Sequence, residues 1–108
     1  MSNLIKLVQG DNLPYIRVAL KNADETPLDV SDATVVVKFR AAGSTTTLST
    51  IPCTFVTDGA DGLIVFNFPG TTLSVPAGSY EGEIEIDFAG QIQTVYNLLK
   101  FLVREDFS

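Results

Sequence analysis

Apolar and polar side chains alternate with a period of two along much of this sequence, a pattern typical of β-strands buried on one face. The run from Tyr80 to Phe88 is the clearest case, because Ile84 and Ile86 share one face while the residues beside them are acidic. We expect the same arrangement in three other runs, whose inward sets are Ile16, Val18 and Leu20; Val35, Val37 and Phe39; and Ile64, Phe66 and Phe68. A core built from alternate residues of several strands indicates an all-β fold.

Segments rich in Gly, Asp and Asn separate the alternating runs and predict turns. The pattern predicts about eight short strands, at approximately residues 3–8, 14–21, 34–41, 46–50, 52–57, 62–68, 79–88 and 91–103. No window has a sustained helical period, and strands at this spacing are typical of sandwiches. We therefore expect an Ig-like antiparallel β-sandwich that occupies residues 1–108 as a single domain, since a chain of 108 residues suits one domain.

The last predicted strand changes phase part-way along its length. Its two sets are Ile92, Thr94 and Tyr96 on one face, and Leu99, Phe101 and Val103 on the other. An extra residue in one strand of a pair re-aims the side chains that follow it. We therefore expect a β-bulge near Asn97 and Leu98.

Four local motifs are interpreted as parts of the fold rather than as functional sites. The Ser- and Thr-rich run from Gly43 to Thr50 predicts an edge strand, and Cys53 is expected to be a small core residue, because the chain has no His to activate its thiol. Tyr80 suits a corner tyrosine whose hydroxyl bonds to nearby backbone. The Asp58–Gly62 loop superficially resembles a calcium loop, but Ala60 interrupts the ligand spacing and a hairpin turn is predicted.

The charge balance and the missing residue types exclude several classes of function. Acidic residues outnumber Lys and Arg by 13 to 7, so the net charge is −6 and no basic surface for nucleic acid or anionic lipid is expected. The absence of His removes imidazole-based catalysis and His-ligated metal sites. No run approaches the roughly 18 apolar residues of a membrane span. We therefore expect a non-enzymatic protein, made in the cytoplasm, that has no catalytic residues, cofactor or metal.

Four carboxylates lie in one row on the outward face of the strand near residues 79–88. The rise per residue along a strand places neighbouring members of the row about 6.6–7 Å from each other. Catalytic acid pairs instead face each other across a cleft, so catalysis is the least favoured interpretation and cation binding comes next. The row is best explained as a solvated or partner-facing stripe. Its members are Glu81, Glu83, Glu85 and Asp87, and the outward basic residues that could offset them are Arg17, Lys21, Lys38 and Arg40.

Three segments together resemble a known family. They are Gly10–Leu20, which opens with Gly-Asp; Pro27–Val35, which contains a Leu-Asp-x-Ser-x-Ala turn; and Ala77–Glu83, which places Gly-x-Tyr before the acidic strand. Their order and spacing resemble the Ig-like N-terminal domain of phage baseplate upper proteins, over most of residues 5–103. The resemblance implies a non-enzymatic docking module within the virion of a tailed phage.

Members of that family commonly continue into a coiled or receptor-binding region, whereas this sequence ends at Ser108. We therefore expect a free-standing module, and decoration or cementing of the capsid is favoured over attachment to the tail or baseplate. The expected partners are other phage virion proteins, and symmetric assembly predicts a homo-oligomer or many copies. The alternative is a soluble carbohydrate- or receptor-binding module, which should present exposed aromatic side chains at its loop tips.

Apolar residues on outward faces are the candidate contacts with a partner. Apolar surface beyond what one thin core needs usually marks an interaction surface. The candidates are Tyr15, Val36, Val56, Leu63, Val65 and Leu102.

Overall fold

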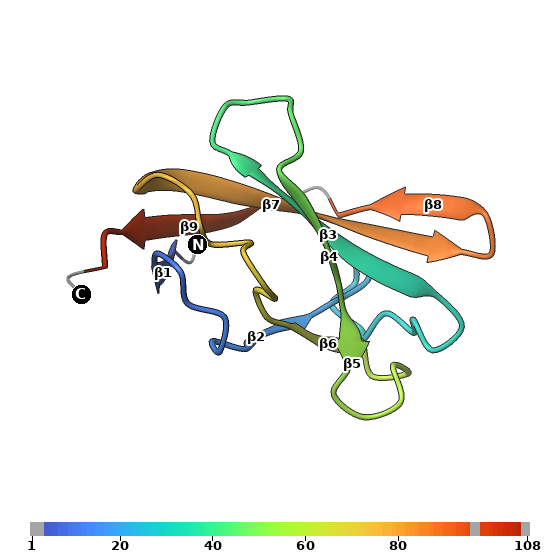
Figure 1. The fold of residues 1–108 in the computed structure, drawn as a ribbon. Coiled ribbons are helices and arrows are strands. Elements are labelled where there is room, and N and C mark those ends of the chain that lie inside the picture. The colour runs from blue at the N-terminus through green and yellow to red at the C-terminus, as the bar shows by residue number, and fades with distance from the viewer. Residues whose placement is uncertain (1–3, 96–97, 107–108) are drawn as a thin grey trace.

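Two stacked β-sheets account for the regular structure of residues 4–95 and 98–106, the part of the chain that this computed structural model describes (Figure 1). The six-stranded sheet has the order β1 (Leu4–Val8), β9 (Leu99–Arg104), β7 (Gly78–Phe88), β3 (Thr34–Ala41) and β4 (Ser49–Pro52), with β8 (Gln91–Thr94) also paired to β7. The three-stranded sheet has the order β2 (Ile16–Ala19), β6 (Leu63–Phe66) and β5 (Thr54–Phe55). The described residues thus form nine strands and no helix, which confirms the predicted all-β sandwich.

Pairing between neighbouring strands is antiparallel except at one margin. There β1 runs parallel to β9, with Ile5 opposite Phe101 and Leu7 opposite Val103. The prediction of a wholly antiparallel sandwich is therefore wrong at this pair. Parallel neighbours need a long connection, and β1 and β9 are joined through the whole of the rest of the chain.

The core lies between the two sheets and is filled by the predicted inward sets. The fully buried members include Val37 and Phe39 from β3, Ile64 from β6 and Ile86 from β7. Aromatic rings occupy its centre: the Phe39 ring stacks on Tyr80, with 5.1 Å between ring centroids, and meets Phe68 and Phe101 edge-on. Such ring pairs stabilise a core beyond the area they bury.

Gly82 allows the long strand β7 to pack closely against these rings. A Cβ built on Gly82 would lie 2.9 Å from a methyl carbon of Val37 and 3.0 Å from the ring of Phe101. The missing side chain therefore makes room for its neighbours in an otherwise bulky inward column.

The predicted corner tyrosine is confirmed. The hydroxyl of Tyr80 donates a hydrogen bond of 2.5 Å to the backbone carbonyl of Pro76, four residues earlier in the chain. This bond ties the loop before β7 to the buried start of that strand.

Three predicted strands differ from those observed. The run at 91–103 is divided into β8 and β9, so the phase change falls between two strands; the expected bulge involves Asn97, which lies outside the described residues. The strand expected at 46–50 is displaced to β4, and most of the Gly43–Thr50 run is a loop in which Ser44 Oγ accepts the Thr46 N–H. The strand expected at 52–57 is reduced to β5. Between β4 and β5 the chain passes from one sheet to the other at Cys53, which is half-buried against the core.

Candidate docking surfaces

The acidic row occupies the middle of the outer face of the six-stranded sheet. Its four carboxylates project from β7, which is flanked by β3 and β9. Register places Lys38 opposite Glu83 and Arg40 opposite Glu81. Strand β3 therefore supplies two of the basic neighbours expected from the sequence. Of the other two, Arg17 lies in β2 of the other sheet and Lys21 lies two residues beyond the end of β2, so the expectation that they could offset the row by cross-strand pairing is wrong.

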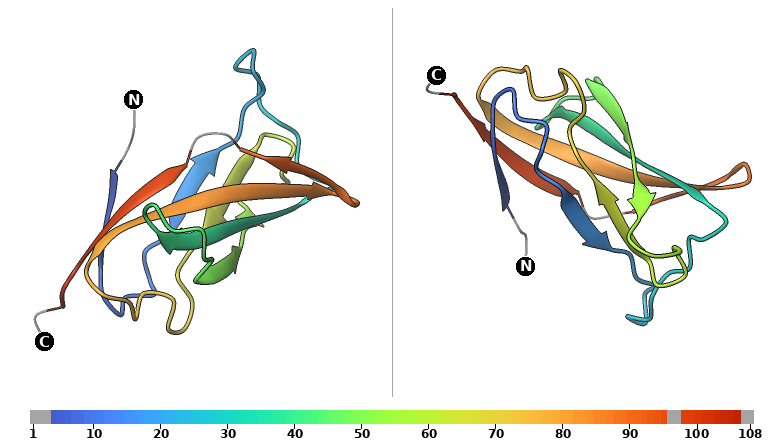
Figure 2. Two further views of the ribbon diagram at one scale, coloured as in Figure 1. Left: turned by 90° about the horizontal axis from the view of Figure 1, so that it is seen from above. Right: turned by 60° about the horizontal axis from the view of Figure 1, so that its bottom comes forward.

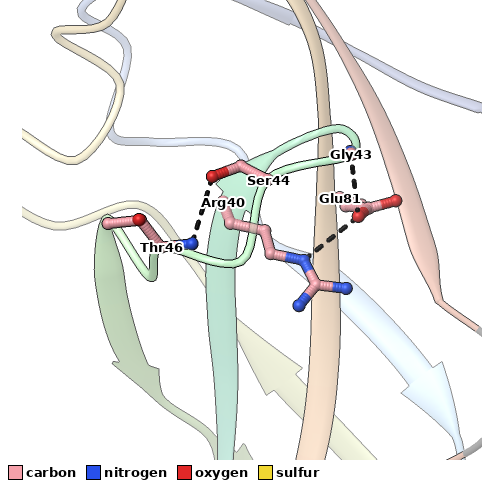
Figure 3. Close-up of polar contacts among 5 residues, drawn as sticks. All are labelled: Arg40, Gly43, Ser44, Thr46 and Glu81. Carbon is pink, nitrogen blue, oxygen red and sulfur yellow. Dashed lines mark hydrogen bonds and ion pairs between the residues drawn. The ribbon is translucent and has the colours of Figure 1, made fainter.

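Two of the row's carboxylates hold turns in place. Glu81 Oε1 accepts hydrogen bonds from Arg40 Nε at 3.1 Å and from the Gly43 N–H at 3.3 Å, which fixes the turn after β3 (Figure 3). Asp87 Oδ1 accepts the Gly90 N–H at 2.6 Å in the β7–β8 turn. These carboxylates are therefore engaged with the protein itself.

A third carboxylate of the row forms a cross-strand ion pair. Lys38 Nζ lies 2.9 Å from Glu85 Oε2, diagonally across from its register partner Glu83. The hydrogen bond and charge of Glu85, with a smaller effect from the charge of Glu83, raise the pKa of Lys38 above its usual 10.5. The row is thus partly neutralised by β3.

The Asp58–Gly62 loop forms the predicted hairpin turn between the antiparallel strands β5 and β6. Asp61 accepts the Thr57 hydroxyl and the Leu63 N–H, which lowers the pKa of Asp61 below its usual 3.8. Asp58 accepts the Ala60 N–H. The two carboxylates therefore serve the turn. Across residues 4–95 and 98–106, no three Asp, Glu or Cys side chains come together in a way that could hold a metal ion.

Cys53 is shielded rather than reactive. Burial raises the pKa of its thiol to about 12, so the nucleophilic thiolate is scarce at neutral pH. This agrees with the packing of Cys53 against the core.

Four of the six predicted contact residues come together on the outer face of the three-stranded sheet. Leu63 and Val65 project outward from the central strand β6, opposite Ala19 and Arg17 of β2. The Val56 N–H, just after β5, donates to the Leu63 carbonyl, so Val56 continues the same row. Tyr15 precedes β2 with the same parity as Arg17 and is 68% exposed.

The other two predicted contacts lie on the opposite side of the molecule. Val36 projects from β3 and Leu102 from β9, on the outer face of the six-stranded sheet. Strand β7 and its acidic row separate them. These two residues therefore flank the acidic row and do not join the other four.

One feature of the surface was missed from the sequence: a groove between the margins of the two sheets, lined in part by Arg17, Lys21 and Lys100. Its position depends on β2 being a marginal strand, which alternation alone does not reveal. A membrane-spanning helix would need at least 18 residues of low polarity, and the described part of the chain contains none.

The fold is similar to that of a solved structure, the N-terminal domain of phage TP901-1 ORF48. The match has a TM-score of 0.61 and covers 94% of this chain and 85% of that chain, at 12% sequence identity. At this identity, the likeness shows a shared fold. No protein-family model matches the sequence, and no curated protein matches it.

Proposed function

We propose that this chain is a non-enzymatic structural protein of a tailed-phage virion, which docks onto a neighbouring virion protein through the outer face of β2, β6 and β5. The observation that carries the proposal is the similarity in fold to a phage protein domain over 94% of the chain. The three sequence segments that resemble phage baseplate upper proteins support the same role independently.

The outer face of the three-stranded sheet is the surface that best suits docking. Val56, Leu63 and Ala19 form one row across the three strands, and Thr54, Val65 and Arg17 form the next. Leu63 and Val65 are only half-buried although they are centred in the sheet. Covering such side chains with a partner would remove apolar area from water, which favours association.

The opposite face is less suited to apolar docking. There the acidic row separates Val36 from Leu102, and three of its carboxylates, those of Glu81, Glu85 and Asp87, already bond to β3 or to adjacent turns. A charged, internally paired face of this kind keeps a small domain dispersed in water.

The carbohydrate-binding alternative has less support. Such sites usually stack sugars on clustered aromatic side chains, and among the described residues Tyr15 is the one exposed aromatic side chain.

Binding to purified phage particles tests the proposal. Heads and tails of the phage that encodes this chain are separated, and each is mixed with the labelled protein and sedimented. We expect saturable binding to one of the two preparations. Binding to heads would indicate capsid decoration, and binding to tails would indicate attachment to the tail or baseplate. Failure to bind either fraction would contradict the proposal.

Matched variants identify the face involved. Leu63→Lys and Val65→Lys place charges on half-exposed positions and should abolish binding while the circular dichroism spectrum stays that of the parent. Leu102→Lys and Glu83→Lys make comparable changes on the other sheet and should bind as the parent does. Loss of binding with the second pair and not the first would assign docking to the six-stranded sheet.

A further inference from the structure

The margin between the two sheets contains a groove of about 790 Å³. One wall is the segment from Ile16 to Lys21, which includes all of β2, and the other comes from β1, β7 and β9. Val18, Ile84 and Leu99 contribute apolar side chains to its lining, which also contains polar and charged groups. Figure 2 shows β2 at the outer margin of its sheet, on the side where β1 and β9 lie.

Strand β2 presents an unpaired backbone edge to this groove. The Leu20 N–H donates to the Gly62 carbonyl at 2.8 Å, so Leu20 and, by alternation, Val18 point their backbone groups toward β6. The backbone groups of Arg17 and Ala19 therefore point the other way. Among the described residues, no backbone hydrogen bond is made on that side of β2. An edge of this kind can accept an additional strand.

The charge of the groove is opposite to that of the protein. Arg17, Lys21 and Lys100 line it, and no described lining residue is acidic, although Lys100 is paired in register with Glu81 of the acidic row; the chain as a whole carries a net charge of −6. Lys21 also lies 3.8 Å from the exposed carboxylate of Glu25. A segment that carries carboxylates beside apolar side chains would complement both the lining and the charge.

We propose that this groove binds an extended segment of a partner protein, rich in alternating acidic and apolar residues, as an added strand on the free edge of β2. Backbone hydrogen bonds to Arg17 and Ala19 supply the pairing, and apolar side chains enter the groove. A second copy of this chain fits less well, because pairing of β2 with itself would bring Arg17 and Lys21 against the same cations. The groove shares Arg17 and Ala19 with the outer face of the three-stranded sheet, but the inference uses the backbone edge of these residues and does not depend on the proposed function.

A synthetic peptide tests the added strand directly. The probe is a capped eight-residue peptide of alternating Glu and Val, and binding is followed by amide hydrogen exchange and by chemical-shift changes in the protein. We expect the amides of Arg17 and Ala19 to become protected from exchange when the peptide binds. The same peptide with N-methyl groups on alternate residues cannot pair along one edge and should bind at least about tenfold more weakly. Equal affinity of the two peptides would overturn strand addition without relying on any protein variant.

Charge is tested on both partners. A peptide with Lys in place of Glu should bind at least about tenfold more weakly. The double variant Arg17→Glu, Lys100→Glu should bind the Glu-containing peptide at least about tenfold more weakly than the parent protein does. The control variant is Lys6→Glu, because Lys6 is exposed and does not line this groove. It should bind the peptide with the affinity of the parent protein. Two results would overturn the proposal. One is that the peptide changes the chemical shifts of Leu63 and Val65 alone, on the outer face of the three-stranded sheet. The other is that the protein forms a dimer through β2 and does not bind the peptide.

Discussion

Arg40 and Glu81 join neighbouring strands of the large sheet through a hydrogen bond of 3.1 Å from Arg40 Nε to Glu81 Oε1. The same carboxylate oxygen accepts the Gly43 N–H. A member of the row that was interpreted from sequence as a solvated or partner-facing stripe therefore helps to position the turn after β3.

The first prediction separates this carboxylate from its neighbour in the row. Glu81→Ala removes the acceptor for both Arg40 and Gly43 and should lower the free energy of unfolding by about 1.5–3 kcal/mol, as for hydrogen bonds to charged groups. Glu83→Ala, at the next outward position, should change it by less than about 0.5 kcal/mol. Urea unfolding of the two variants measures the difference, and equal losses would show that Glu81 has no special part in the turn.

The second prediction concerns the tyrosine corner. Tyr80→Phe keeps the stacked ring but removes the donor to the Pro76 carbonyl, so the protein should lose about 1 kcal/mol of stability and keep its fold. Tyr15→Phe, on an exposed ring, is the control and should leave the urea midpoint unchanged. A Tyr80→Phe midpoint equal to that of the parent would mean that the hydroxyl bonds equally well to water.

The third prediction compares two glycines that both have positive φ angles. Gly62 (φ 73°) lies against backbone, and a Cβ there would clash with the Leu20 carbonyl oxygen; at Gly10 (φ 79°) nothing lies within 4 Å of a Cβ. Gly10→Ala should therefore cost only the left-handed strain of about 1–2 kcal/mol. Gly62→Ala must also displace backbone, and its urea midpoint should fall well below that of Gly10→Ala. Equal midpoints would contradict the close approach at Gly62.

The fourth prediction is a pH dependence. Hydroxyl and backbone hydrogen bonds from Ser31 lower the pKa of Asp29, and those from Thr57 and Leu63 lower the pKa of Asp61, below the usual 3.8. A lowered pKa in the folded state contributes stability that is present above pH 3.8 and is lost as the pH falls through the lower folded value. Side-chain carbon shifts followed by NMR should give midpoints below 3.8 for both carboxyls. Ser31→Ala and Thr57→Val should each raise the midpoint of the matching aspartate, and unchanged midpoints would show that these hydroxyls do not set the pKa.

The alternation of apolar and polar residues predicted most strands of the sandwich, because it indicates which face of a strand is turned toward the core. Val35, Val37 and Phe39 alternate with Val36, Lys38 and Arg40, and the first three are buried as predicted. Val30 and Leu73 are equally buried but lie in loops, so no periodic pattern marks them. Their burial depends on how the loops fold over the ends of the sheets.

The candidate surfaces were only partly predictable for a related reason. Parity along a strand indicated that Leu63 and Leu102 both point outward, but not that they lie on opposite sides of the molecule. That depends on which strands pair, as does the groove beside β2. The parallel pairing of β1 with β9 likewise joins segments from the two ends of the sequence, and local patterns carry no information about it.

The most direct test of the proposed docking role is a cryo-electron microscopy reconstruction of the intact virion to which the proposal assigns this chain. We expect density for the two-sheet sandwich at symmetric positions on the particle, with Leu63 and Val65 covered by a neighbouring virion protein. Particles that lack the sandwich would contradict a structural role in the virion. A bound sandwich whose β2, β6 and β5 face remains open to solvent would contradict the proposed docking surface.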